Sequence, residues 1–69
     1  MQAIQYLDVS VGARLRALRT ERAWTQADLS HFSRMSTGDL SRIETGRLKP
    51  TTAQLLRLDR VFEGQLLGA

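Results

Sequence analysis

One segment of the chain, residues 24–46, carries the same helix-start pattern twice. Thr25 is followed three residues later by Asp28, and Ser36 is followed in the same way by Asp39. A threonine or serine at such a position caps a helix, because its hydroxyl accepts a backbone N–H of the first turn. A carboxylate three residues on partly completes a capping box and favours the positive end of the helix. Two starts this close leave room for a short helix, a tight turn and a second helix.

Apolar residues flank both starts in the arrangement of a hydrophobic staple. Trp24 precedes the first cap and Leu29 lies four positions after it, while Met35 and Leu40 repeat the arrangement at the second. Such pairs fix the angle at which the chain enters a helix. Gly46 then supplies a residue that readily adopts the left-handed conformation of a helix end. The segment is therefore predicted to be a helix-turn-helix. Its two helices are predicted over residues 26–33 and 37–45.

Upstream of the motif, a helix is predicted over residues 11–22, with Ser10 or Asp8 as its cap. Residues 9–12 make a poor helix interior, because they combine β-branched residues with a glycine. Residues 1–9 are therefore assigned to an N-terminal arm, either an extended or partner-binding arm or a loosely ordered terminus. The apolar spacing also allows one longer helical stripe, formed by Ile4, Leu7, Val11, Leu15 and Leu18.

Downstream, Thr51 and Gln54 repeat the capping pattern with a true capping-box glutamine, which predicts a helix over residues 52–62. Gly64 is expected to end this helix. The tail, residues 64–69, contains two adjacent leucines, which either form a dimer contact or fold back on the core. The apolar stripe of the helix is formed by Leu55, Leu58, Val61 and Phe62.

Together these features resemble the lambda-repressor-like (Cro/repressor-type) helix-turn-helix family. Thr25-Gln26 opens the first helix of the motif, Leu29 lies inside it, and Ser36 caps the second helix. The resemblance covers residues 11–62 and implies an all-α, compact four- to five-helix domain, here over residues 10–63. Further matches are Val11-Gly12, Leu15, Leu18-Arg19, Leu40-Ser41-Arg42-Ile43-Glu44, Gly46 and Pro50.

Two positions depart from the family pattern. Arg34 stands where the family usually has the glycine of the turn, and Ala23 stands where it usually has a helix-ending glycine. The resemblance also implies an ion pair between Arg19 and Glu44, which would join the first helix to the second helix of the motif. Helical spacing allows this pair, because each residue lies at the inner edge of its own helix.

The outward face of the second motif helix is the predicted reader of DNA bases. A major groove admits a helix, and small residues let the backbone come close to the bases. Arg42 can bond a guanine through its forked guanidinium, and the methyl of Thr37 can touch thymine. Gly38 either permits this approach or is a tolerated first-turn glycine, and Asp39 either accepts from a cytosine amino group or serves as a capping carboxylate. The outward positions are Gly38, Ser41, Arg42 and Thr45.

Phosphate-binding positions are predicted around this face. Gln26 lies at the start of one helix and Ser36 at the start of the next, and the N–H groups at such helix starts can hold an anion. Arg47 and Lys49 lie in the loop after the second motif helix, which in the resembling family follows the phosphate backbone. The chain has ten basic and seven acidic residues, a net charge of +3, which is compatible with a polyanionic partner.

The composition argues against several other classes of protein. The chain has no cysteine and one histidine, His31, so neither a metal site nor a disulfide framework nor a cofactor is expected. It has no phosphate-binding glycine loop and no catalytic cluster, so an enzyme is not expected. It has no apolar run long enough to span a membrane, so an intracellular protein is expected. The family resemblance implies the prokaryotic cytoplasm, with association to the nucleoid when the protein is bound.

Two functions follow from these patterns. The leading prediction is sequence-specific binding of double-stranded DNA by a small, repressor-like transcriptional regulator that acts as a homodimer. The alternative is a protein-interaction module, such as an antitoxin-like or adaptor domain, whose main surface faces a protein partner. The modest net charge, the sparse side chains of the second motif helix and the apolar chain ends keep this alternative open. The salt dependence of duplex binding separates the two, because phosphate contacts give a steep slope.

Overall fold

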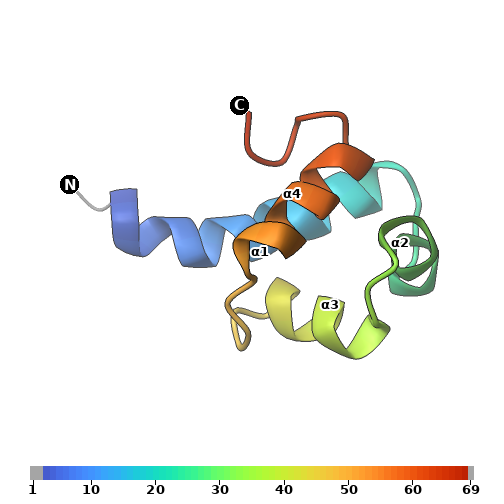
Figure 1. The fold of residues 1–69 in the computed structure, drawn as a ribbon, viewed down its shortest axis with the longest axis horizontal. Coiled ribbons are helices and arrows are strands. Elements are labelled where there is room, and N and C mark those ends of the chain that lie inside the picture. The colour runs from blue at the N-terminus through green and yellow to red at the C-terminus, as the bar shows by residue number, and fades with distance from the viewer. Residues whose placement is uncertain (1–2, 69) are drawn as a thin grey trace.

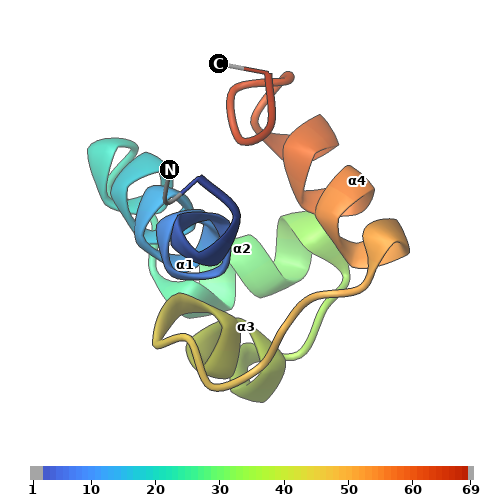
Figure 2. The same cartoon turned by 90° about the vertical axis from the view of Figure 1, so that its left-hand side faces the viewer.

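The computed structural model describes the backbone of residues 3–68 and the side chains of residues 11–68. Within that range the chain forms four α-helices and no strand, which confirms the predicted all-α fold. The first half of α1 extends beyond the other three helices (Figure 1), and a view along α1 shows α3 on one side of it and α4 on another (Figure 2). The helices are α1 (Ala3–Glu21), α2 (Gln26–Ser33), α3 (Thr37–Glu44) and α4 (Thr52–Val61).

The start of α1 differs from the prediction. The helix begins at Ala3, so neither Ser10 nor Asp8 is its cap, and residues 3–9 are helical rather than extended. No proline interrupts this segment, and extending an existing helix adds one hydrogen bond for each residue fixed. The longer apolar stripe would include Ile4 and Leu7, whose side chains lie outside the described part of the chain. Residues 1–2 lie outside it as well.

Gly12, which argued against a helix in this region, lies inside α1 at its contact with α3. A methyl group built on its Cα would collide with the backbone carbonyl oxygen of Ile43 and would lie 3.0 Å from that of Glu44. The glycine therefore lets the backbones of the two helices approach closely. Its unfavourable helix propensity, about 1 kcal/mol relative to alanine, is offset by this tertiary contact.

The caps predicted for α2, α3 and α4 form, with one difference. The Thr25 hydroxyl accepts from the Asp28 backbone N–H at 3.0 Å, and the Asp28 carboxylate accepts from the Thr25 N–H at 2.9 Å. The Ser36 hydroxyl accepts from the Asp39 N–H at 3.1 Å. The Asp39 carboxylate does not complete a box, because it accepts from the Arg42 guanidinium at 3.0 Å instead. The box at the start of α4 is complete.

Three residues other than glycine lie in the left-handed region within the described part of the chain: Ala23, Arg34 and Glu63, the last with φ 56°. Ala23 has φ 57° and Arg34 has φ 60°, and these are the two positions where the resembling family usually has glycine. Arg34 forms the end of α2 and keeps the backbone hydrogen bond to the Ser30 carbonyl at 2.8 Å. The turn therefore forms without a glycine, at the energetic cost that a β-carbon has in this conformation.

The core lies between all four helices. The tail also contributes to it, because Leu66 is 2% exposed while Leu67 is 44% exposed. The sequence left open whether these leucines fold back on the core or form a dimer contact. Leu66 folds back on the core, and Leu67 stays at the surface. The Leu67 N–H donates to the Asp59 carboxylate at 2.8 Å, which holds the tail against α4. The buried apolar residues are Leu15, Leu18, Leu29, Met35, Leu40, Ile43, Leu58, Phe62 and Leu66.

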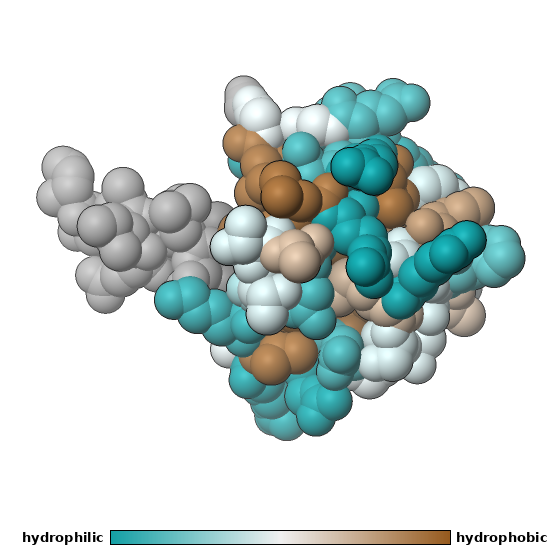
Figure 3. Space-filling view, viewed as in Figure 1, coloured by the Kyte–Doolittle hydropathy of each residue, from teal (hydrophilic) through white to brown (hydrophobic). Residues whose placement is uncertain are grey.

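The surface of the face seen in Figure 1 is mixed. Figure 3 shows several separate apolar patches, divided by hydrophilic side chains. Within residues 3–68, no helix combines the length and the apolar character that crossing a membrane requires.

Candidate nucleic-acid interface

The position of α3 depends on an ion pair with α1. Arg19 Nε lies 2.7 Å from Glu44 Oε2, and a second guanidinium nitrogen lies 3.0 Å from Glu44 Oε1. The two side chains are 12% and 3% exposed. The hydrogen bond to Glu44 raises the pKa of Arg19, while burial acts in the opposite direction. A two-pronged, charge-assisted contact of this kind fixes orientation as well as distance.

The same carboxylate also reaches α2. Gln26 Nε2 donates to Glu44 Oε1 at 3.2 Å, and Arg19 donates to the Trp24 carbonyl at 2.8 Å. Glu44 thereby joins α1, the start of α2 and α3. The side-chain amide of Gln26, predicted as a phosphate anchor, is engaged in this internal network. A phosphate at the start of α2 would therefore be held through the backbone N–H groups of its first turn.

The outward side of α3 carries few bulky side chains. Gly38, Arg42 and Thr45 are exposed and Ser41 is partly exposed, whereas Leu40 and Ile43 are buried. Exposed residues also cap both ends of this face, with Ser36 and Thr37 at the start of α3 and Thr45 at its end. The helix can therefore approach another surface closely without moving a large side chain.

Arg42 is the long charged side chain on this face, and it bends toward the start of α3. Its guanidinium bonds Asp39 and lies 3.8 Å from the position that a methyl group on Gly38 would occupy. The side chains of Arg42 and Asp39 are 59% and 36% exposed. An exposed pair of this kind contributes about 0–1 kcal/mol. Arg42 can therefore exchange Asp39 for another acceptor at little cost.

A basic loop is fastened to the end of α3. The backbone N–H groups of Arg47 and Leu48 donate to the Arg42 carbonyl at 2.8 and 3.1 Å. Gly46 has φ 79°, which permits this tight reversal. Leu48 packs on the core, while Arg47 and Lys49 are exposed. Apart from Gln26 at the start of α2, the residues predicted for base and phosphate contacts thus lie on one continuous stretch, from Ser36 to Lys49.

Some contacts that shape this region were not predicted from the sequence. The Ser30 hydroxyl donates to the Met35 carbonyl, which closes the turn between α2 and α3. The bond between Gln26 and Glu44 was also missed, because it joins residues far apart in the chain. No short sequence motif marks either contact. Within the described residues, no group of histidine or acidic side chains could hold a metal ion.

Comparison with known families identifies the motif. The model of a helix-turn-helix domain family matches residues 10–65. The chain belongs to this helix-turn-helix domain family. The match covers the second half of α1, all of α2, α3 and α4, and the turn that follows.

The chain is also similar to longer bacterial proteins. It is 40% identical over 50 residues to a protein of Mycobacterium bovis named as an uncharacterized helix-turn-helix-type transcriptional regulator. It matches two proteins of the same description from strains of Mycobacterium tuberculosis with the same identity. Each match covers 72% of this chain and 20% of the relative, so the chain spans about a fifth of their length. No solved structure matches the chain.

Proposed function

We propose that the chain binds double-stranded DNA in a sequence-specific manner through the outward face of α3, and that it regulates transcription. The observation that carries this proposal is the exposed row formed by Gly38, Ser41, Arg42 and Thr45 between a capped helix start and a basic loop. A helix-turn-helix places its second helix in the major groove, with the N-terminal residues of that helix at the base edges. Relatives named as transcriptional regulators support the same function.

Base reading and phosphate binding would be divided between neighbouring residues. Arg42 would leave Asp39 and bond a guanine edge, while Thr37 would touch a thymine methyl. Asp39 would then act mainly as the orienting partner of Arg42 in the free protein. Arg47, Lys49 and the N–H groups at the start of α3 would hold the phosphate backbone, which fixes register but carries no sequence information.

We infer that the domain acts as a homodimer. One short helix contacts few base pairs, so useful specificity requires two copies, with half-sites about 34 Å apart on the duplex. Leu67 and Leu56, which are 44% and 55% exposed, supply apolar surface for such a contact. A hollow of about 270 Å³ between the basic loop, α4 and the tail adjoins Leu67. Sedimentation of the free and the duplex-bound protein tests this, and a monomer in both conditions would exclude it.

Repression is the simplest regulatory outcome for this domain. Occupying an operator requires only tight binding, which the helix-turn-helix itself would provide. A protein that acts in this way would work in the prokaryotic cytoplasm, at the nucleoid. Neither a catalytic group nor a cofactor is needed for this function.

The test compares two basic residues with different assigned roles. Arg42→Ala should cost about 1–3 kcal/mol on a selected duplex and relax specificity at one or two base pairs. Lys49→Ala should weaken binding to selected and scrambled duplexes alike and reduce the salt slope by about 1. Arg60→Ala, on α4, is the matched control and should leave duplex binding unchanged. The measurement is a set of binding titrations at several salt concentrations.

Equal losses for Arg42→Ala on both duplexes would show that α3 does not read bases through this residue. A flat salt dependence of the unmodified protein would exclude phosphate binding altogether, because each neutralised phosphate contributes about −0.9 to the slope. That second result would favour the alternative function, a protein-interaction module.

A further inference from the structure

A second surface of the molecule combines aromatic and basic side chains. It is an open trough of about 590 Å³ between the end of α2 and α4. None of its lining residues comes from α3, so it is separate from the proposed DNA-binding face. We call its aromatic and basic lining, together with one valine, the basic-aromatic trough. The residues are Trp24, Phe32, Val61, Arg34, Arg57 and Arg60.

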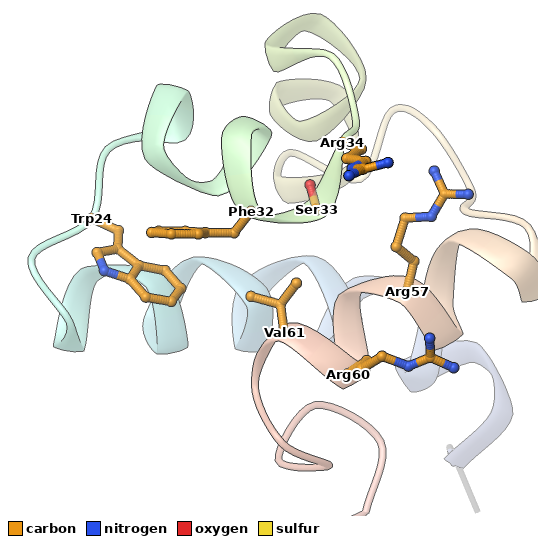
Figure 4. A pocket seen from close by; sticks show the side chains of 7 residues that line it. All are labelled: Trp24, Phe32, Ser33, Arg34, Arg57, Arg60 and Val61. Carbon is orange, nitrogen blue, oxygen red and sulfur yellow. The ribbon is translucent and has the colours of Figure 1, made fainter.

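The apolar end of the trough is a ring surface. Phe32 packs on Trp24 with ring centroids 4.6 Å apart, yet the phenylalanine is 51% exposed. Figure 4 shows Trp24, Phe32 and Val61 gathered at this end. An exposed aromatic ring that is held in place by a second ring offers a contact surface with little remaining conformational freedom.

The other end of the trough is basic. Figure 4 shows Arg57 and Arg60 extending from α4 and Arg34 extending from the turn after α2. Within residues 11–68, the guanidinium groups of these arginines make no ion pair or hydrogen bond, and no acidic residue lines the trough. The backbone at Arg34 has a φ of 60°, a conformation that favours glycine, yet this position carries an arginine. The surface therefore presents three positive charges beside an apolar floor.

We propose that the basic-aromatic trough binds an acidic peptide segment of a partner protein, with an aromatic side chain of that segment packed against Phe32. The arginines would pair with carboxylates on either side of this anchor. Charge complementarity selects the partner, since opposite charges steer association and like charges oppose it. Aromatic residues and arginine are also the side chains most enriched in protein interfaces.

Other anions fit this surface less well. A phosphate backbone would use the arginines but would gain nothing from the apolar floor. A small aromatic carboxylate would remain largely in solvent, because binding sites for small molecules usually enclose about 70–90% of the ligand surface. An extended peptide can cover an open trough along its length. Because α3 lies elsewhere, the peptide and a duplex would bind at the same time.

The test uses the 69-residue chain and a short fluorescent peptide in which aspartate and glutamate flank one phenylalanine. Fluorescence anisotropy at low ionic strength should show saturable binding, and the emission of Trp24, the sole tryptophan, should change in parallel. A peptide with serine in place of phenylalanine should bind about 10-fold more weakly. A peptide with lysine in place of the acidic residues should not bind.

Protein variants locate the site. Arg57→Gln combined with Arg60→Gln should weaken peptide binding by about 3–10-fold, without changing duplex binding. Phe32→Ser should also weaken peptide binding. If the Phe32→Ser protein is unstable, the double variant of Arg57 and Arg60 still tests the site. Arg16→Gln, an exposed arginine of α1 outside the trough, is the matched control and should have no effect.

Several results would overturn the proposal. Absence of saturable binding, or equal binding of the serine peptide, would show that no anchor is recognised. Equal weakening by Arg16→Gln would indicate general charge attraction. Displacement of the peptide by duplex or single-stranded oligonucleotide would assign the trough to nucleic acid, and equally tight binding of a free aromatic carboxylate would assign it to a small molecule.

Discussion

Glu44→Ala should be the most destabilising single substitution in the interface region. It removes the acceptor of three hydrogen bonds, at 2.7, 3.0 and 3.2 Å. The Arg19 side chain, which is 12% exposed in the intact protein, would keep only the Trp24 carbonyl as a partner. Breaking one side of a buried ion pair costs about 3–5 kcal/mol. A domain of this size has a total stability of about 3–10 kcal/mol. The variant should therefore lose a third or more of its stability, or fail to fold.

The assay is urea unfolding, followed through the emission of Trp24 and through helical circular dichroism. The exposed pair formed by Arg42 and Asp39 supplies the control, because Arg42→Ala should cost about 0–1 kcal/mol. The double variant Arg19→Met with Glu44→Leu should be more stable than Glu44→Ala, because it leaves no buried charge without a partner. If Glu44→Ala stays within about 1 kcal/mol of the unmodified protein, the pair is hydrated and the reasoning fails.

Three further substitutions test the backbone. Gly12→Ala should lower the free energy of unfolding by about 1–3 kcal/mol, because the added methyl collides with the Ile43 carbonyl across the contact between α1 and α3. Gly38→Ala should instead raise it by about 0.5–1 kcal/mol, because only Arg42 lies near the added methyl, and it should weaken duplex binding. Arg34→Gly should raise the free energy of unfolding by about 0.5–1 kcal/mol, because the backbone φ of 60° is easier for glycine than for arginine. It should also weaken binding of the acidic peptide.

Urea unfolding measures all three stability changes, and titrations with duplex or peptide measure the binding changes. An unchanged stability for Gly12→Ala would mean that α1 and α3 can move apart at no cost. Unchanged duplex affinity for Gly38→Ala would show that close approach of α3 is not needed. A loss of stability for Arg34→Gly would show that the arginine contributes more to folding than its backbone conformation costs.

The sequence by itself determined the local features of the motif. The bounds of α2 and the starts of α3 and α4 were predicted correctly, because caps, staples and helix-ending residues act within a few positions of one another. The amphipathic division of α3, with Leu40 and Ile43 inside and Gly38 and Arg42 outside, followed from helical periodicity alone. The family resemblance added the pairing of Arg19 with Glu44, which local patterns merely allowed.

Tertiary structure decided the features that depend on neighbours distant in the chain. The propensity argument placed the start of α1 too late, because it counted Gly12 as a helix breaker and could not include the backbone of α3 packed against it. The sequence could not predict which of Leu66 and Leu67 is buried, because the two side chains are identical. Leu66 is buried and Leu67 is exposed in the tail that Asp59 holds against α4. Helix propensity is a local energy of less than about 1 kcal/mol per residue, so a single close contact between elements can override it.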